Sequence, residues 1–223
     1  MSVTTGLHTA LPMIFSGFSK RQLRTLRSLD SPRKIQEFVE KLAYNIEEEG
    51  ETAHSPRKVL EYGKAHCLEA AVFAACAFRF HGRPPLLMDL RAVRDEDHVL
   101  CLFRQDGRWG SVAKSKFTGL RSRDPVYRTL RELALSYFED FYNLAGEKTL
   151  REYSQPLDLS RLDDPEWMTC ENGVWSIPET LDRMRHYRLL GHMGEKNLRR
   201  IKGDPFRAGL VGYPRSEKIR HLV

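Results

Sequence analysis

The chain has 223 residues, of which 41% are hydrophobic and 30% are charged, and its formal net charge is +6. A chain of this length and composition folds as a globular protein and buries a core without a disulfide or metal staple. No apolar stretch approaches the ~20 residues of a membrane span, and the first thirty residues lack the segment order of a secretory signal. We therefore expect a cytoplasmic protein without membrane contacts, whose oligomeric state stays unknown at this stage.

The charge and cysteine patterns argue against further classes of protein. The arginine-rich stretches are interspersed with acidic residues, which is typical of a solvated face, so we do not expect nucleic-acid binding. No C-x-x-C pair occurs among the four cysteines, and the histidines at 81, 186 and 192 lack ligand-like spacing. We expect neither a metal nor another cofactor.

The N-terminal third predicts an arm followed by a helix. Residues 1–30 lack clear periodicity and are predicted to form an N-terminal arm, with a short helical turn in its second half. Ser31 and Pro32 are typical of a helix start, and the apolar spacing that follows predicts an amphipathic helix over 31–49. The same tetrapeptide, SPRK, returns at 55–58 as a second helix start.

The middle of the chain predicts a buried helix and a hairpin. Residues 65–80 are apolar on nearly every side, which indicates a central helix surrounded by protein. A strand is predicted at 86–93, and two further strands flank the turn RQDG. If the four residues of RQDG form the loop, Phe103 pairs with Arg108 and His98 lies opposite Ala113.

The remaining sequence predicts one long helix and a C-terminal extension. Asp124 and Pro125 are typical of a helix start, and the stripe of apolar residues after them predicts a helix over 124–143 that packs on the sheet. A short helix is expected within 177–190. We thus predict an arm, a core domain over 31–145, and an extension over 146–223 that packs on the core.

Cys67 lies where chemistry would favour a thiolate. At the first turn of a buried helix the helix dipole and the free backbone N–H groups stabilise negative charge. The N–H of Cys67 could also supply part of an oxyanion hole. His66 is its neighbour, but adjacent residues on a helix point in different directions, so we expect His66 to be poorly placed as a base. His98, at the start of the first hairpin strand, can be brought to the thiol by folding.

Two segments together resemble a known superfamily. GKAHCLEAAVFAACAFRFHGRPP and EDHVLCLFRQDGRW resemble the nucleophile helix and the His-bearing hairpin of the transglutaminase-like superfamily of papain-type folds. The resemblance covers about residues 55–115. It implies an α+β fold with a papain/transglutaminase-like core, in which a central helix packs on an antiparallel sheet with flanking helices. It also implies that Cys67 is the nucleophile and His98 the general base and acid.

The implied activity is acyl transfer through a thioester, as in a cysteine protease-like hydrolase, a deamidase or a transamidase-like acyltransferase, on a peptide or other amide substrate. One departure is that the family usually carries an Asp opposite the His, where this chain has Ala113. The alternative is therefore a catalytically weak or inactive member that binds a peptide or protein partner in its cleft. The candidates for a third member are Ser111, Asp97 and Asp89. The candidates for lining the cleft are Glu61 and Tyr62, as possible oxyanion donors, and Trp109, for which core packing is the competing interpretation.

Overall fold

The computed structural model describes residues 14–162 and 165–214. Within them, the largest element is an antiparallel sheet with the strand order β6-β5-β4-β3-β7-β9, in which β8 also pairs with β3. Its strands are β3 (Leu86–Ala92), β4 (His98–Gln105), β5 (Arg108–Val112), β6 (Arg123–Tyr127), β7 (Leu150–Ser154), β8 (Leu157–Asp158) and β9 (His186–Arg188).

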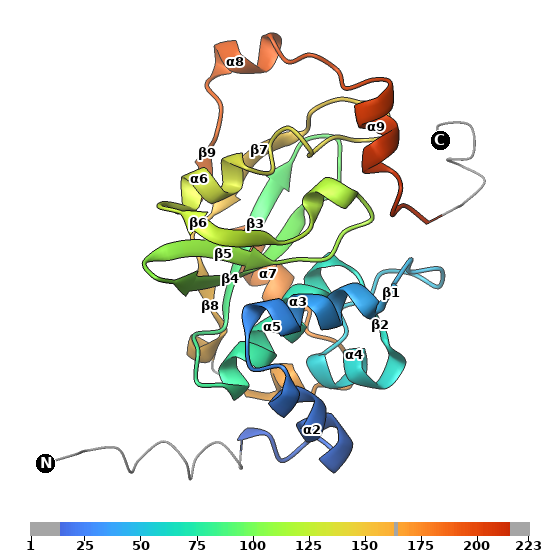
Figure 1. Ribbon diagram of the computed structural model, residues 1–223, viewed down its shortest axis with the longest axis vertical. Helices are drawn as coiled ribbons and strands as arrows, with labels where there is room; N and C mark the ends of the chain where they lie inside the picture. The colour runs from blue at the N-terminus through green and yellow to red at the C-terminus, as the bar shows by residue number, and fades with distance from the viewer. Residues whose placement is uncertain (1–13, 163–164, 215–223) are drawn as a thin grey trace, which may run out of the picture.

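Helices flank this sheet, so the protein is of the α+β kind. Figure 1 shows α2, α3, α4 and α5 gathered below the sheet and α6, α8 and α9 above it. A separate two-stranded parallel sheet, β1 with β2, lies beside α4. The remaining bounds are α2 (Lys20–Ser28), α3 (Pro32–Lys41), β1 (Ala43–Tyr44), α4 (Pro56–Tyr62), β2 (Lys64–Ala65), α5 (Cys67–Phe80), α6 (Leu130–Leu135), α7 (Ser176–Arg183), α8 (His192–Lys196) and α9 (Asp204–Gly209), with 3-10 turns at Thr118–Leu120, Leu159–Arg161 and Pro165–Met168.

Helix α5 is the predicted central helix, and it begins at Cys67. Its residues from Leu68 to Phe78 are buried, and all of them except Glu69 are apolar, as a helix surrounded by protein requires. The sheet has a core on each face because side chains alternate along a strand. Along β4, Val99 and Cys101 pack with α5, whereas Leu100 packs with Leu133 of α6 in the second core.

The N-terminal segment packs on this core. Helix α2 begins after the N-cap Ser19, and Phe15, Phe18, Leu26 and Leu29 are buried in the same cluster as α5. Residues 14–29 are therefore part of the packed structure rather than an extended arm. The first thirteen residues of the predicted arm lie outside the described residues.

Helix α3 ends eight residues earlier than predicted. It stops at Lys41, and Leu42 adopts an extended conformation. The ammonium group of Lys114 donates hydrogen bonds to the carbonyl oxygens of Val39 (3.0 Å) and Leu42 (2.7 Å), which satisfies the end of the helix. Ile46, which lies within the predicted helix over 31–49, is 51% exposed, so the apolar spacing after Lys41 does not correspond to a buried helix face.

The hairpin between β4 and β5 has a different register from the predicted one. Its loop has two residues, Asp106 (φ 48°) and Gly107 (φ 75°), as in a type I′ turn. Phe103 therefore pairs with Gly110 rather than with Arg108. Continuing this register places Ala113 opposite Leu100, so the prediction that Ala113 faces His98 is wrong.

The predicted helix over 124–143 is also wrong in its first part. Asp124 and Pro125 lie in β6, the edge strand of the sheet, where a proline costs no ladder hydrogen bond. The helix in this region is the short α6, whose N-cap is Thr129. Val126, expected on the buried stripe, is 63% exposed.

The C-terminal part of the chain contributes strands to the sheet. β7 pairs with β3, and β9 pairs with β7, so the sheet continues across the boundary expected at residue 145. The short helix expected within 177–190 corresponds to α7, after which the chain enters β9. None of the helices in the described ranges is long and apolar enough to cross a membrane.

Candidate functional site

Cys67 stands at the first position of α5 because of the turn that precedes it. Gly63 ends α4 in a left-handed conformation (φ 66°), and the chain then forms β2. In the parallel pairing of β1 with β2, Tyr44 lies beside Ala65, two residues before the cysteine. His66 is the N-cap of α5 and has extended backbone, so it does not belong to the helix itself.

The thiol of Cys67 opens into a cleft of about 730 Å³. An adjoining hollow of about 30 Å³ is lined by both Cys67 and His98, so folding brings the two candidate catalytic side chains to one place. Tyr44 and Lys116 line both spaces, and Trp175 lies on the wall of the larger one.

Two imidazoles determine the ionisation of Cys67. Burial opposes formation of the thiolate, but the neighbouring imidazoles of His66 and His98 outweigh it and lower the pKa of Cys67 to about 6. A free cysteine has a pKa of about 8.5, so a large fraction of this thiol is ionised at neutral pH. The two core cysteines behave oppositely, since burial raises the pKa of Cys76 and of Cys101.

His98 is buried and is oriented by the backbone. Its Nε2 atom donates to the carbonyl oxygen of Leu120 at 2.8 Å, which leaves Nδ1 as the ring nitrogen available to the thiol. Leu120 ends the 3-10 turn Thr118–Leu120, which follows β5. The rings of Tyr137 and Phe141 pack edge-on against the imidazole, with centroids 6.3 Å away.

His66 lies closer to the thiol than the sequence suggested. Its Nδ1 atom is 4.0 Å from the Sγ atom of Cys67, and its Nε2 atom lies 3.0 Å from the carbonyl oxygen of Thr52. Burial disfavours its charged form, but the neighbouring Cys67 thiolate and Glu69 raise the pKa of His66 to about 9. The argument from helix geometry does not place this side chain, because His66 is an extended N-cap residue outside the helix.

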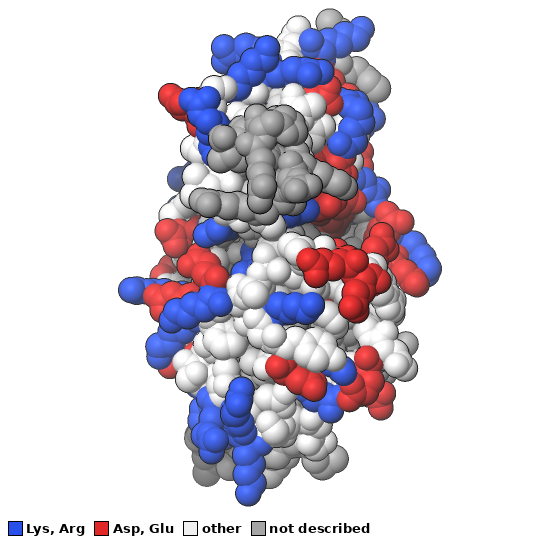
Figure 2. All heavy atoms as spheres, turned by 90° about the vertical axis from the view of Figure 1, so that its right-hand side faces the viewer, with Lys and Arg blue, Asp and Glu red and all other residues white. Residues whose placement is uncertain are grey.

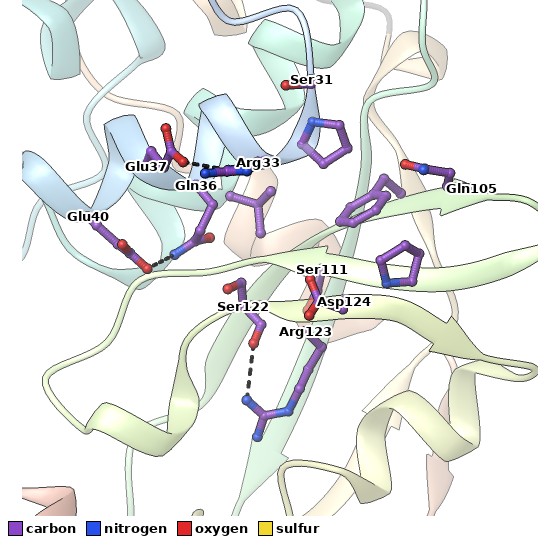
Figure 3. A pocket seen from close by; sticks show the side chains of 14 residues that line it. Ser31, Arg33, Gln36, Glu37, Glu40, Gln105, Ser111, Ser122, Arg123 and Asp124 are labelled. Atoms are coloured by element: carbon purple, nitrogen blue, oxygen red, sulfur yellow. Dashed lines mark hydrogen bonds and ion pairs between the residues drawn. The ribbon is translucent and has the colours of Figure 1, made fainter.

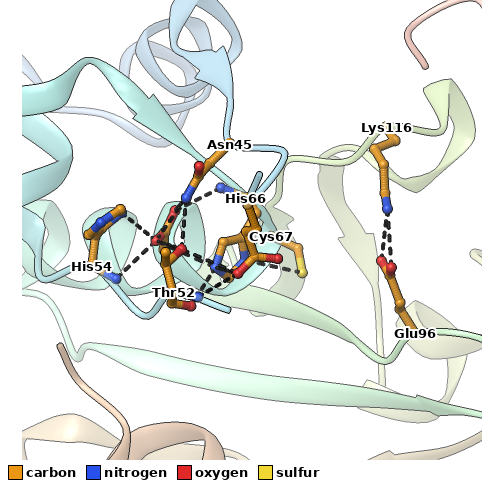
Figure 4. Close-up of polar contacts among 9 residues, drawn as sticks. Asn45, Thr52, His54, His66, Cys67, Glu96 and Lys116 are labelled. Carbon is orange, nitrogen blue, oxygen red and sulfur yellow. Dashed lines mark hydrogen bonds and ion pairs between the residues drawn. The ribbon is translucent and has the colours of Figure 1, made fainter. Parts of the chain in front are cut away.

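A buried carboxylate, Glu69, holds the loop that precedes the cysteine. Figure 4 shows Asn45, Thr52 and His66 grouped beside Cys67. Glu69 accepts hydrogen bonds from the backbone N–H of His66 (3.0 Å) and of His54 (2.9 Å). The side chains of Thr52 (2.8 Å) and Asn45 (3.1 Å) also donate to it. The network fixes the loop before α5, and with it the position of His66.

The imidazole of His98 bonds Leu120, and the hydrogen bonds of the three predicted third members go to other partners. The Oγ atom of Ser111 bonds the hydroxyl of Tyr137 at 2.6 Å, which in turn donates to the carbonyl of Arg121. Asp97 lines the cleft, but its Oδ1 atom accepts from the backbone N–H of Ala92. Asp89 accepts from Nε2 of His186 at 3.1 Å. The carbonyl of Leu120, rather than a side chain, is the group that orients the imidazole of His98.

The predicted cleft-lining residues lie elsewhere. Glu61 does not line the cleft, and Tyr62 lines a neighbouring hollow, where its hydroxyl bonds Lys58 at 3.0 Å. Trp109 packs beside the second core near the turn of the hairpin, as the competing interpretation held. Tyr44 and Lys116 were not predicted to line the cleft. The pairing of β1 with β2 brings Tyr44 near the cysteine, and the path of the chain after β5 brings Lys116 there.

A second hollow, of about 580 Å³, lies between α3 and the strands β5 and β6 (Figure 3). Gln36, Ser111 and Arg123 are among the residues that line it, and its lining includes neither a cysteine nor a histidine. It therefore offers no Cys-His pair. Within the described ranges, no group of three or more His, Cys, Asp or Glu side chains is placed to hold a metal ion.

The face that carries β1 and β2 has a mixed charge pattern. Figure 2 shows acidic side chains across the middle of this face, with basic ones among them, and further basic side chains toward its two ends. The charged residues that line the cleft include Glu47, Glu51, Glu96 and Lys116, of which the last two form an ion pair at 3.0 Å. Positive charge is therefore not continuous over this face.

Comparison with known proteins adds no assignment. No protein-family model matches the sequence, and no curated protein matches it either.

Proposed function

We propose that the protein is a cysteine-dependent amide or acyl hydrolase or acyltransferase, with Cys67 as nucleophile and His98 as the group that moves the proton. The observation that carries the proposal is that the thiol and the imidazole line one hollow at the start of α5, although they are 31 residues apart in sequence. The lowered pKa of Cys67 supports it, because the thiolate is the attacking species. The resemblance of residues 55–115 to the transglutaminase-like superfamily points to the same chemistry.

The reaction would proceed in two steps. His98 takes the proton of the Cys67 thiol, and the thiolate attacks the carbonyl carbon of the substrate while the carbonyl electron pair moves to oxygen. The backbone N–H of Cys67, free at the first turn of α5, faces the resulting oxyanion. Collapse of this intermediate breaks the bond to the leaving group, which takes the proton from His98. In the second step His98 removes a proton from water or an amine, which attacks the thioester and expels the thiolate.

The rival proposal is a protein that binds a peptide or protein partner in the cleft without catalysis. The observation that favours it is the lack of a carboxylate on His98, whose far nitrogen meets a neutral carbonyl instead. Without that negative charge, the imidazolium formed during the reaction is less stabilised than in a Cys-His-Asp triad. The two proposals differ in whether a covalent acyl intermediate forms.

The test is acylation of the intact chain by p-nitrophenyl acetate near pH 7, followed by mass spectrometry. We expect a burst of about one nitrophenolate per chain and an acetyl group on the peptide that contains Cys67. Cys67→Ala should abolish the burst, and His98→Gln should slow the hydrolysis of the acetyl thioester by about 10²-fold or more.

A matched control is Cys170→Ser. Cys170 is a second half-buried free cysteine, but it does not line the cleft, so its substitution should leave the burst unchanged. If Cys67 is acetylated no faster than Cys170, the catalytic proposal is wrong and the binding proposal stands.

A further inference from the structure

The site contains a second imidazole that the proposed mechanism does not use. Nδ1 of His66 lies 4.0 Å from the sulfur, and its Nε2 atom faces the carbonyl of Thr52 at 3.0 Å. Both ring nitrogens thus meet acceptors, and an imidazolium is the form in which both nitrogens donate. A ring that is satisfied in this way keeps its proton.

The charges around His66 support the same form. Two carboxylates approach its Nε2 atom, with Oε1 of Glu69 at 3.5 Å and Oε1 of Glu47 at 3.6 Å. Glu69 is fully buried and is held by backbone N–H groups, so its position is fixed. A carboxylate close to an imidazole favours the charged ring.

His98 has the opposite surroundings. Its imidazole bonds the carbonyl of Leu120 and packs against the rings of Tyr137 and Phe141. Asp95, Glu96 and Asp97 line the same hollow, but their carboxylates bond Thr149, Lys116 and the backbone N–H of Ala92, respectively. The imidazolium of His98 therefore has the sulfur as its anionic partner and loses that partner once the thioester has formed.

We propose that the two imidazoles have separate roles: His66, fixed by Glu69, is a permanent cation that stabilises the Cys67 thiolate, and His98 alone transfers the proton. The inference rests on the proposed thiol chemistry. In the resting site the thiol proton passes to His98, which later gives it to the leaving group. His66 holds the same proton throughout the cycle, and no further acid or base is required for the balance.

The test separates thiolate formation from proton transfer by comparing His66→Gln with His98→Gln. Alkylation of Cys67 by iodoacetamide, followed peptide by peptide over pH 5–10, reports the thiolate. Hydrolysis of the acetyl thioester reports the base. For His66→Gln we expect the alkylation midpoint to rise by about one pH unit or more, and thioester hydrolysis to stay within about tenfold of wild type. For His98→Gln we expect hydrolysis to fall by about 10²-fold or more at every pH.

The outcomes distinguish this inference from the proposed function. A wild-type midpoint near ~8.5 contradicts the proposed function itself. A lowered wild-type midpoint that His66→Gln leaves unmoved overturns only the separate role of His66. Loss of thioester hydrolysis in His66→Gln to the extent seen in His98→Gln also overturns it.

If His66→Gln does not fold, NMR titration of the histidine rings in the wild-type chain decides the question. We expect the His66 ring to titrate at about pH 9 and to titrate lower after Cys67 has been alkylated, because its anionic partner is then lost. A His66 ring that titrates near ~6.5 both before and after alkylation overturns the inference.

Discussion

The imidazole of His98 is held by the main chain, since its Nε2 atom lies 2.8 Å from the carbonyl oxygen of Leu120. A carbonyl fixes the tautomer and the orientation of the ring as a carboxylate would, but it adds no negative charge. The backbone therefore holds His98, whereas the carboxylate of the site, Glu69, lies beside the imidazole of His66.

The first prediction concerns Ala113→Asp, which the sequence-based register would place opposite His98. Ala113 is fully buried, and both its backbone N–H and its carbonyl bond the side chain of Gln36. A carboxylate buried there lacks a compensating partner, so we expect the free energy of unfolding to fall by about 3 kcal/mol or more. Urea titration measures this loss. Ala113→Asn serves as the neutral control and should cost less, and faster thioester hydrolysis in Ala113→Asp would contradict the observed register.

The second prediction concerns Gln36, whose carboxamide continues the hydrogen bonding of β5. Its Oε1 atom accepts from the N–H of Ala113, and its Nε2 atom donates to the carbonyl of Ala113, both at 3.0 Å. Gln36→Leu leaves both buried groups unpaired, so we expect a loss of about 2 kcal/mol in urea titration. Glu37→Gln on the same helix is the control, since its ion pair with Arg33 is exposed. Equal losses in the two variants would show that the carboxamide contributes nothing specific.

The third prediction concerns the pH dependence that Glu69 gives to stability. Burial opposes its ionisation, but the charge of His66 and the N–H groups of His54 and His66 hold the pKa of Glu69 below its usual range. A carboxyl group with a lowered folded pKa stabilises the protein above its unfolded pKa of ~4.3, and this contribution is lost as the pH falls through the folded value.

The variant that tests it is Glu69→Gln. Between about pH 5 and pH 3 its free energy of unfolding should decline less steeply than that of wild type, although it should be lower at neutral pH by about 1–3 kcal/mol. Denaturant titrations at several pH values measure both quantities. An acid decline as steep as that of wild type would mean that other carboxylates account for it.

The fourth prediction concerns Asp89 and His186, a buried pair outside the cleft. The hydrogen bond from Nε2 of His186 to Asp89, at 3.1 Å, raises the pKa of His186. A group with a raised folded pKa stabilises the protein below its unfolded pKa of ~6.5, and this contribution is lost as the pH rises through the folded value. We therefore expect Asp89→Asn to lower the free energy of unfolding more at pH 6 than at pH 9.

Asp89→Asn should at the same time leave alkylation of Cys67 unchanged, because Asp89 contacts His186 and not His98. The measurements are urea titration at the two pH values and peptide-resolved alkylation. Slower alkylation at Cys67 would mean that Asp89 is coupled to the site after all.

Local signals in the sequence were enough to predict the elements that carry the site. The buried run after Cys67 predicted α5, and strands β3, β4 and β5 followed from their apolar content and turn residues. These predictions were confirmed because each depends on neighbouring residues. The position of Cys67 at the start of α5 was predicted on the same basis.

The errors arose where distant residues decide the structure. Lys114 satisfies the end of α3 from more than seventy residues away, which no periodicity could indicate. Pro125 lies in an edge strand, a position that depends on the order of strands in the sheet. The pair Asp106-Gly107 did carry a local signal for a two-residue turn, and its neglect produced the wrong register.

The proximity of the His66 ring to the thiol was missed for a geometric reason. Rules for side-chain direction on a helix hold inside the helix, but the backbone of His66 is extended. The carboxylate three positions later, Glu69, is a helix-start signal of the kind that indicates an N-cap at residue 66. That spacing was visible in the sequence.

The pairing of β3 with β7 also bears on how the chain is made. β3 and β4 leave the ribosome as neighbours, but β7 ends only at Ser154, more than sixty residues after β3 begins. Until β7 has been synthesised, the edge of β3 that β7 will cover stays unpaired, and an unpaired strand edge can pair with other chains. Cys67 and His98 are therefore synthesised well before β7, the strand that covers this edge of the sheet. This interval is the time when a chaperone would matter most.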